Sequence, residues 1–282
     1  MSGGDRLRER VECVLSSLDR VVVAVSGGVD SLTLATLAGR MPHLAVGMAH
    51  AVSPAVPPAA TARVRKHAER EGWRLSVLDA GEFDDESYRT NPVDRCRYCK
   101  RSLYASLRRL ADGVILSGTN VDDLGDYRPG LESAAEHDVR HPYVEADVDK
   151  EGVRTIARAL GLGGVAELPA APCLASRIET GLRIEPELLA FVDRAENVVR
   201  AVLDPRVVRV RVRGDGLVVE LDPAALERLR GTARRELERR LLALAPDPRP
   251  RTGVRFAPYR MGSAFVHDAG SPEDSRAGAG AQ

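Results

Sequence analysis

The feature that most constrains this chain is an apolar run at residues 21–25, which leads into a small loop, residues 26–31, and then into residues of helical composition. An uninterrupted apolar run next to paired glycines is typical of a strand buried on both faces of a parallel sheet. Gly27 and Gly28 let the backbone approach a ligand closely, and the N–H groups of the first helical turn point toward it. The two serines that bound the loop add hydroxyl donors, so we expect the ligand to be a phosphate.

The loop sequence, Ser-Gly-Gly-Val-Asp-Ser, is not a Walker A motif, because Asp30 stands where that motif needs a lysine. It resembles the PP-loop of the ATP pyrophosphatases, which split ATP between its α and β phosphates and activate a substrate as the adenylate. The resemblance implies that this PP-loop holds the leaving pyrophosphate, that Asp30 helps to position Mg²⁺, and that Ser31 takes part in the reaction. A glycine turn that only closes a strand and a helix is the alternative, but a six-residue match at the end of the first strand favours ATP. The expected ATP contacts in the PP-loop are Ser26, Gly27, Gly28, Val29, Asp30 and Ser31.

Short apolar runs alternate with helical segments over the first 180 residues. Further strands are predicted at residues 44–49, 74–78 and 114–116, and helices at residues 5–18, 57–71, 95–110 and 150–160. Strands that are separated by helical crossovers form a parallel, doubly wound α/β sheet, whose ligand lies at the carboxyl ends of the strands. We therefore predict an α/β domain of the PP-loop ATP pyrophosphatase type at residues 1–180.

A loop of short polar residues, 117–130, follows the fourth predicted strand. Because the carboxyl ends of parallel strands lie at one edge of the sheet, this loop is expected to face the same cleft as the PP-loop. A solvated surface loop would explain its Asp and Gly residues but not the apolar strand that leads to it. Its expected nucleotide contacts are Gly118, Thr119, Asn120 and Asp123.

Two of the four cysteines form a Cys-x-x-Cys pair, Cys96 and Cys99. Asp94 suits the N-cap position, which puts both thiols in the first turns of one helix and on one face. The helix N-terminus and the basic side chains around the pair favour thiolate over thiol. On this pattern alone a redox pair, half of a zinc site and two incidental thiols all stay open.

The other two cysteines stand alone in the sequence. Cys13 lies in the first predicted helix and is expected to pack there. Cys173 follows a proline, a poor context for a packed helix, and Arg177 brings a positive charge nearby. A buried structural thiol is the alternative, but we expect Cys173 to be exposed and reactive. A reducing compartment favours metal or sulfur chemistry over disulfides for these cysteines.

Residues 181–265 follow a different pattern, which predicts a smaller α+β domain. Its predicted elements are a helix at 185–203, strands at 207–212, 217–221 and 253–257, and two helices within 223–244. Arg209, Arg211 and Arg213 alternate and so share one face of a strand, which either binds anions or is the solvated side of an edge strand. The two interpretations are evenly balanced. Residues 266–282 are rich in Gly, Ala, Ser and Pro and are expected to form a disordered tail.

Several motifs, in their order and spacing, resemble those of the LarE-type ATP-dependent sulfur transferases over almost the whole chain. They are the PP-loop and residues 91–100, 118–130, 172–177, 209–215 and 259–263. The resemblance implies that ATP adenylates the carboxylate of a pyridinium carboxylate mononucleotide, on the route to the nickel-pincer cofactor of lactate racemase, and that sulfur then displaces AMP. It also implies a homo-oligomer and substrate contacts at Arg177, Arg209, Arg211, Arg260 and Ser263.

The family resemblance gives the cysteines two different roles. In one branch the cysteine at the position of Cys173 gives up its own sulfur, whereas in another that cysteine and a Cys-x-x-Cys pair hold a [4Fe-4S] cluster. The pair in this chain favours the cluster branch, with Cys96, Cys99 and the catalytic Cys173 as ligands and one iron open for sulfide. The implied cofactors are ATP, Mg²⁺ and the cluster, and the implied partners are a small-molecule acceptor and a sulfide donor.

Other functions are compatible with parts of the pattern. Residues 50–54 and 178–181 depart from the family pattern near the expected cleft, which leaves a different small-molecule acceptor open. An amide-forming PP-loop ligase is one alternative, but it would need no cysteine at the cleft. Thiolation of tRNA is another, but it normally brings an RNA-binding module and a basic surface. A nucleotide-binding scaffold is the third, and its turnover would not depend on Asp30 or Cys173.

Composition and charge bound the remaining classes. The 41 basic and 41 acidic residues balance, so charge does not direct the chain to nucleic acid or to a membrane surface. The N-terminus lacks an apolar signal core and no apolar stretch approaches bilayer length. We therefore expect a cytoplasmic protein with no membrane or nucleic-acid partner.

Overall fold

A computed structural model describes residues 3–110, 113–125, 130–246 and 253–265. The chain divides into two compact units: unit 1 contains Met1–Tyr88 and Asp94–Cys173, and unit 2 contains Arg89–Val93 and Leu174–Gln282. The predicted tail and residues 126–129 of the predicted nucleotide loop lie outside the described residues. In the described ranges, no helix is both long enough and apolar enough to span a bilayer.

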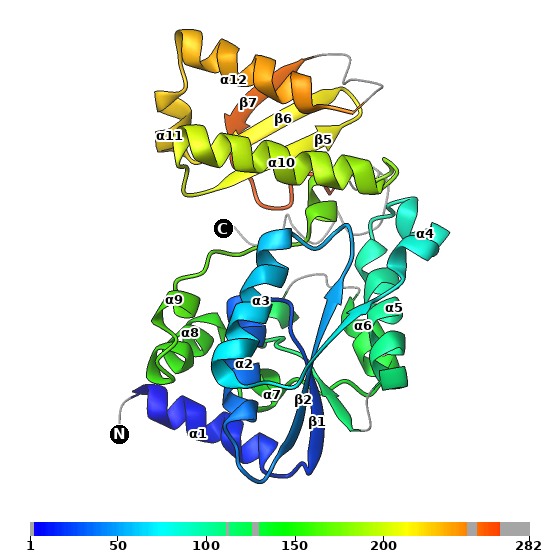
Figure 1. The fold of residues 1–282 in the computed structure, drawn as a ribbon, viewed down its shortest axis with the longest axis vertical. Helices are drawn as coiled ribbons and strands as arrows, with labels where there is room; N and C mark the ends of the chain where they lie inside the picture. The colour runs from blue at the N-terminus through cyan, green and yellow to red at the C-terminus, as the bar shows by residue number, and fades with distance from the viewer. Residues whose placement is uncertain (1–2, 111–112, 126–129, 247–252, 266–282) are drawn as a thin grey trace, which may run out of the picture. The chain divides into compact units, whose positions relative to one another are not determined.

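The elements of each unit follow the chain order that Figure 1 shows. Unit 1 contains α1 (Gly3–Leu15), β1 (Arg20–Ala24), α2 (Val29–Gly39), β2 (Ala45–Val52), α3 (Pro58–Glu71), β3 (Leu75–Asp79), the 3₁₀ turn η1 (Glu82–Asp84), α4 (Glu86–Arg89), α5 (Arg95–Leu110), β4 (Val114–Leu116), the 3₁₀ turn η2 (Val121–Leu124), α6 (Gly130–Glu136), α7 (Pro142–Glu145), α8 (Lys150–Ala159) and α9 (Gly163–Ala166). Unit 2 contains the 3₁₀ turn η3 (Leu174–Arg177), α10 (Pro186–Leu203), β5 (Val208–Arg213), β6 (Gly216–Leu221), α11 (Pro223–Arg228), α12 (Gly231–Leu244) and β7 (Val254–Pro258).

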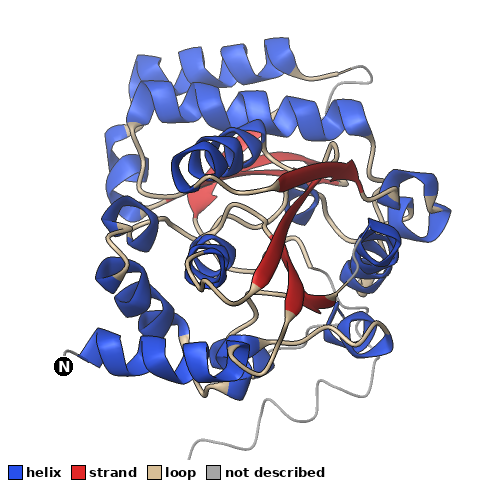
Figure 2. Cartoon of the chain, turned by 60° about the horizontal axis from the view of Figure 1, so that its bottom comes forward, coloured by secondary structure: helices blue, strands red, loops and turns tan. Residues whose placement is uncertain are grey.

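The sheet of unit 1 has four parallel strands in the order β3-β2-β1-β4, so the strand that precedes the PP-loop is an inner one. Val21 of β1 pairs with Val46 of β2 on one side and with Val114 of β4 on the other. Figure 2 shows helices, in blue, beside the strands, in red. The predicted parallel α/β sheet is therefore confirmed.

Residues of β1 and β4 enter apolar cores on the two faces of this sheet. Val21 and Val23 of β1 are fully buried in a core that α1, α2 and α8 complete with side chains such as Leu32 and Ile156. On the opposite face, Ile115 of β4 packs in a core with residues of α5 and α6. Full burial of one such side chain contributes about 1.5–3 kcal/mol to stability. Val22 and Ala24 of β1 are half-buried against this second core, and apolar contacts on both faces explain why β1 is an uninterrupted apolar run.

Two helices of unit 1, α3 and α1, test what the sequence predicted about a helix end and a buried helix face. Helix α3 ends at Gly72, whose φ of 67° is left-handed, so the predicted termination by glycine is confirmed. Helix α1 buries Val11 and Leu15, which are four residues apart and lie on one face. Cys13 lies between them in sequence and is exposed, so the prediction that it packs in the core is wrong.

Unit 2 is a three-stranded sheet with the order β5-β6-β7, in which β5 and β6 are antiparallel and β6 and β7 are parallel. Helix α10 packs against β5 and α12, and α12 also contacts β7. Every residue of β6 is buried. This mixed sheet with helices confirms the predicted smaller α+β fold in the C-terminal part of the chain.

A short segment from the middle of the chain, Arg89–Val93, also belongs to unit 2. Asn91 has a left-handed φ of 57° and is fully buried. Its side-chain amide donates to the carbonyl oxygens of Glu179 at 2.8 Å and Leu182 at 2.9 Å, and its own carbonyl accepts from the N–H of Gly181 at 2.9 Å. Unit 2 is thus assembled from two separate pieces of the chain.

Candidate functional site

The PP-loop joins β1 to α2 and is held in shape by its own two serines. The Ser31 hydroxyl accepts from the backbone N–H of Ser26 at 3.1 Å and lies 3.1 Å from the Ser26 hydroxyl. Gly27 has a φ of 84°, and a Cβ there would lie 2.9 Å from the carbonyl oxygen of Ala60. Gly28 is the N-cap of α2 and offers no side chain to cap the first turn. The loop therefore presents backbone N–H groups at a helix N-terminus, as an anion site requires.

The loop after β4 comes directly against the PP-loop, as predicted. A Cβ on Gly118 would lie 2.9 Å from the backbone nitrogen of Ser31, so only glycine allows this approach. The Asn120 side-chain amide donates to Asp30 Oδ1 at 3.2 Å. Both loops leave neighbouring parallel strands at their carboxyl ends. Unit 1 thus brings its predicted nucleotide contacts together, and their roles in binding stay predictions.

Other residues of the second loop stabilise it rather than face Asp30. The carboxylate of Asp123 accepts from the backbone N–H of Asn120 at 3.1 Å, and the side-chain oxygen of Asn120 accepts from the backbone N–H of Asp122 at 3.1 Å. The Thr119 hydroxyl lies 3.0 Å from the hydroxyl of Ser117. This capping box fixes the position of Asn120.

Sequence reasoning missed a residue that pairs with Asp30. Lys150, the first residue of α8, donates from Nζ to Asp30 Oδ2 at 2.5 Å. The hydroxyl of the buried Tyr143 donates to the backbone carbonyl of Asp30 at 3.1 Å. The only sequence signal was that the chain has just three lysines, of which Lys150 begins a predicted helix.

His50 ends the buried part of β2 beside the PP-loop and lies in the segment that departs from the family pattern. It is 1% exposed, its Nδ1 lies 2.7 Å from the carbonyl oxygen of Val25, and its Nε2 lies 2.9 Å from the Thr61 hydroxyl. The neutral ring satisfies both partners when Nδ1 donates and Nε2 accepts. Burial lowers the pKa of His50, and the carbonyl of Val25 opposes that shift.

This lowered pKa makes a testable contribution to acid lability. A histidine whose pKa falls on folding stabilises the folded chain above its unfolded pKa of about 6.5, and the contribution is lost as the pH drops below that value. We expect His50→Gln to be less stable than the native chain at pH 7.5 but to lose less of its unfolding temperature between pH 7.5 and 5.5. Thermal unfolding followed by circular dichroism measures both. Parallel curves for the two proteins would contradict the assignment.

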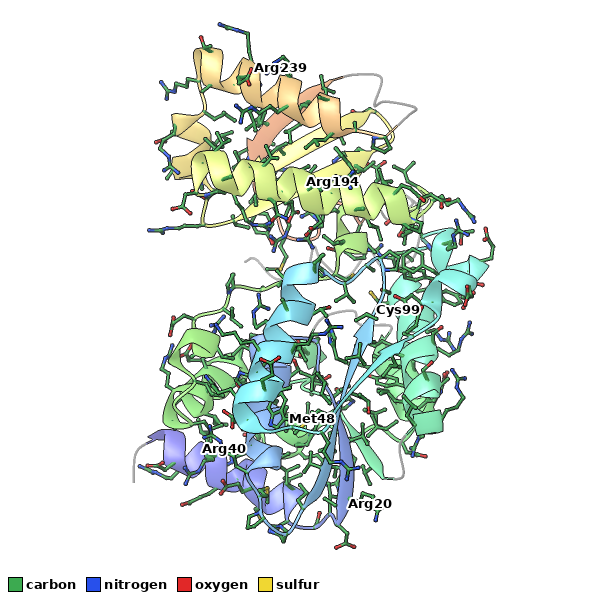
Figure 3. All side chains as sticks on the ribbon, viewed as in Figure 1. Arg20, Arg40, Met48, Cys99, Arg194 and Arg239 are labelled. Carbon is green, nitrogen blue, oxygen red and sulfur yellow. The ribbon has the colours of Figure 1, made fainter. Side chains whose placement is uncertain are left out.

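The three cysteines of the predicted metal site all belong to unit 1. Cys96 and Cys99 occupy the first turns of α5, as predicted. Figure 3 shows Cys99 toward the end of the sheet opposite to Arg20, the residue at which β1 begins. Cys173 is exposed, so the prediction of an accessible thiol is confirmed. Cys99 therefore lies toward the carboxyl ends of the strands, where the PP-loop also lies.

The surroundings of Cys99 contradict the predicted thiolate. Loss of solvent raises the pKa of the Cys99 thiol, the nearby carboxyl of Glu82 raises it further, and the thiols of Cys173 and Cys96 add to the shift against the opposing charge of Lys100. Glu82 itself is 3% exposed, and burial raises its pKa. The prediction from helix position and basic neighbours is wrong for Cys99, because burial and a carboxyl from η1 outweigh them.

The donor set fits the implied cluster in number and chemistry. Three thiols of one unit interact electrostatically, and thiolates are the ligands that iron–sulfur clusters use. Within the described ranges, no three His, Cys, Asp or Glu side chains are gathered closely enough to hold a single metal ion. A cluster spreads its ligands over several irons, so the assignment of Cys96, Cys99 and Cys173 as cluster ligands stays a prediction.

The predicted substrate residues all belong to unit 2, where Arg177, Arg209 and Arg211 are buried, Ser263 is half-buried and Arg260 is exposed. Arg209 and Arg211 are 7% and 4% exposed, so the solvated-face interpretation of this strand is wrong. Arg211 Nε donates to Glu220 Oε2 at 3.0 Å, and Arg211 Nη2 donates to the carbonyl oxygen of Arg260 at 3.2 Å. The Ser263 hydroxyl donates to Glu220 Oε1 at 2.5 Å. Burial lowers the pKa of Arg209.

Arg177 belongs to the same group of buried charged residues as Arg209, Arg211 and Glu220, and it pairs with a second buried carboxylate. Arg177 Nε donates to Glu196 Oε1 at 2.9 Å, and the two side chains are 4% and 2% exposed. Glu196 also accepts from Arg200 at 2.8 Å. Counting only the described residues, this group holds three buried arginines and two buried glutamates, Glu196 and Glu220, an excess of positive charge that an anion would complement. The predicted substrate contacts stay predictions.

Removing a carboxylate from this group of buried charged residues should lower the stability of the fold. Breaking a buried ion pair costs about 3–5 kcal/mol, because the remaining charge stays desolvated. We expect Glu196→Gln to lower the free energy of unfolding by about that amount, as measured by urea titration. Glu236→Gln is the matched control, because Glu236 also pairs with two arginines, Arg239 and Arg240, but lies on the surface, where loss of a pair changes little. Equal stability of the two variants would contradict the prediction.

Comparison with known proteins adds three relatives, although no family model matches the chain. An uncharacterized protein of Synechocystis sp. is 35% identical over 223 residues, 78% of this chain and 82% of its own length. An uncharacterized protein of Methanocaldococcus jannaschii is 25% identical over 207 residues, 72% of this chain and 78% of its own. The pyridinium-3,5-bisthiocarboxylic acid mononucleotide synthase of Lactiplantibacillus plantarum is 31% identical over 220 residues, 75% of this chain and 78% of its own. This chain therefore belongs to the LarE-type family, which includes that synthase.

Proposed function

We propose that this chain is an ATP-dependent sulfur transferase, which adenylates a carboxylate of a pyridinium carboxylate mononucleotide and converts it into a thiocarboxylate. The name of the Lactiplantibacillus plantarum relative, a pyridinium-3,5-bisthiocarboxylic acid mononucleotide synthase, supports the substrate class. The observation that carries the proposal is the direct approach of two loops at the carboxyl ends of β1 and β4, where Gly118 lies against Ser31 and Asn120 bonds to Asp30. This is the place where a parallel sheet binds its ligand.

The reaction needs two displacements. First, a carboxylate oxygen of the substrate attacks the α-phosphorus of ATP, and pyrophosphate leaves into the PP-loop, whose N–H groups and serine hydroxyls bind it. The carboxylate of Asp30 offers oxygen ligands, which suit Mg²⁺. Second, sulfide sulfur attacks the acyl carbon, and AMP leaves with the carboxylate oxygen. The product therefore carries a C–S bond in place of one C–O bond.

The exposed Cys173 and the Cys96–Cys99 pair would provide the sulfur site. These three thiolates would hold a [4Fe-4S] cluster, which would supply an iron without a protein ligand that could bind sulfide. Alternatively, the Cys173 sulfur attacks the acyl carbon and displaces AMP, and elimination of the Cα proton then breaks the Cβ–S bond, which leaves the thiocarboxylate and dehydroalanine. The accessible position of Cys173 suits either role, because its sulfur must reach the acyl carbon as a donor, whereas as a ligand it would hold a cluster that the acyl carbon must approach.

The proposal is tested with the full chain, purified anaerobically and incubated with ATP, Mg²⁺, sulfide and pyridinium-3,5-biscarboxylic acid mononucleotide. We expect equal amounts of AMP and pyrophosphate by ion-exchange chromatography and a product whose mass shows oxygen replaced by sulfur. ADP in place of AMP, or AMP without a sulfur-containing product, would argue against sulfur transfer to this substrate. Omission of the mononucleotide is the control, because no carboxylate is then present to adenylate.

Iron and sulfide analysis of the same preparation separates the two sulfur sources. About four irons per chain favour the cluster. An iron-free chain that loses one sulfur and two hydrogens during turnover favours donation by Cys173.

A further inference from the structure

Lys150 is the residue near the PP-loop for which the proposed function has no role yet. It begins α8, whose N-terminus is capped by Asp149, and its backbone N–H donates to Asp122 Oδ2 at 3.1 Å. Its side chain reaches from there to Asp30, which is 120 residues away in the sequence. The charge of Lys150 is therefore delivered to the PP-loop by the packing of the fold.

Both oxygens of the Asp30 carboxylate are engaged. Oδ1 accepts from the Asn120 amide at 3.2 Å, and Oδ2 accepts from Lys150 Nζ at 2.5 Å. If Asp30 positions Mg²⁺, a divalent cation must come close to an oxygen that already holds an ammonium group. Two cations at one oxygen repel each other, so one of the two donors must move away.

Lys150 is the donor that can move. Asn120 is fixed by its capping box with Asp122 and Asp123, whereas Lys150 carries its charge on a flexible four-carbon stem. The Lys150 side chain is 35% exposed, so it can swing without disturbing the core. The nearest destination for its charge is the phosphate chain that arrives with Mg²⁺, because ammonium groups bind phosphate oxygens as point charges.

We infer that Lys150 is an exchanging cation: it neutralises Asp30 while the PP-loop is empty and transfers to a nucleotide phosphate when Mg²⁺ takes Asp30. The inference rests on the proposed binding of ATP and Mg²⁺ at the PP-loop. It assigns a binding residue that sequence patterns did not identify. It also predicts opposite effects of Lys150 on metal alone and on the nucleotide complex, which a purely structural ion pair would not produce.

The experiment measures two affinities in Lys150→Met. Mn²⁺ replaces Mg²⁺ as the probe for metal alone, and its free concentration is followed by electron paramagnetic resonance in nucleotide-free protein. The complex of Mg²⁺ with α,β-methylene-ATP, which is not cleaved at the reactive bond, is titrated by calorimetry. We expect Mn²⁺ to bind at least about threefold more tightly than to the native chain, and the nucleotide complex to bind at least about tenfold more weakly.

Matched variants keep this test decisive. Lys150→Arg retains the charge and should stay within about threefold of the native chain in both titrations, and Lys66→Met removes an exposed lysine of α3 and should change neither. Lys150→Gln, which keeps a donor for Asp30, replaces Lys150→Met if thermal unfolding shows the latter to be misfolded. Unchanged affinities, or affinities that fall together, would overturn the inference alone. A native chain that binds no nucleotide would overturn the proposed function as well.

Discussion

Asp30→Asn is expected to lower the rate of pyrophosphate release at least about 100-fold. The substitution keeps the size of the side chain and its contact with Asn120 but removes the negative charge on which a divalent cation at the PP-loop depends. Loss of metal-centred charge stabilisation in the transition state typically has effects of this order or larger. Phosphate release measured with a coupled pyrophosphatase assay, at saturating ATP and mononucleotide, checks the prediction.

Stability separates this effect from misfolding. The ion pair of Asp30 with Lys150 is partly exposed, at 23% and 35% for the two side chains, so its loss changes the free energy of unfolding by no more than about 1 kcal/mol. The unfolding temperature of Asp30→Asn should therefore lie close to that of the native chain. A variant that is folded and turns over at more than about a tenth of the native rate would show that Asp30 is not needed for metal positioning.

Cys173→Ser is expected to abolish the sulfur-containing product while the adenylation step persists. The thiol is needed only after the adenylate has formed, whether it holds a cluster or supplies the sulfur itself. Isotope exchange between pyrophosphate and ATP, in the presence of the mononucleotide, should stay within about threefold of the native rate, whereas thiocarboxylate formation should fall at least about 1000-fold. Mass spectrometry of the product gives the second rate.

The remaining cysteines sharpen this result. Cys13→Ser is the matched control, because Cys13 is also an exposed cysteine but lies on α1, and both of its rates should be unchanged. If a cluster is used, Cys99→Ser should lose thiocarboxylate formation as completely as Cys173→Ser. If Cys173 gives its own sulfur, Cys99→Ser should retain it. Loss of exchange together with sulfur transfer in Cys173→Ser would place the thiol in the first step and contradict the proposed order.

Local patterns in the sequence were enough to predict the parallel sheet and the position of the PP-loop. The apolar run of β1 is continuous because one face of the strand is fully buried and the apolar residues of the other are half-buried against a second core, and that signal is contained in five consecutive residues. Gly27 and Gly118 were predicted as nucleotide contacts, and the structure adds that a Cβ at either position would lie 2.9 Å from a backbone atom of another segment. The ends of parallel strands then brought the two loops together by topology alone.

What the sequence could not show depended on pairs of residues that are far apart in the chain. Alternation placed Arg209 and Arg211 on one face but could not reveal that Arg211 pairs with Glu220 of β6 or that the charge of Glu196 of α10 acts on Arg209. The pKa of Cys99 depends on Glu82, which lies on another element, so the helix N-terminus gave the wrong sign. Lys150 and Asp30 meet across 120 residues, and no local spacing predicts such a contact.

The placement of Arg89–Val93 in unit 2 has a consequence for how the chain can be divided. The Asn91 amide donates to the carbonyl oxygens of Glu179 and Leu182, which lie about ninety residues later in the chain. A fragment that stops at Cys173 would leave this segment without its carbonyl partners, and a fragment that starts at Leu174 would lack it. Neither unit can therefore be separated from the other by a single cut, and supplying Arg89–Val93 as a peptide should be required for the C-terminal fragment to reach its native stability.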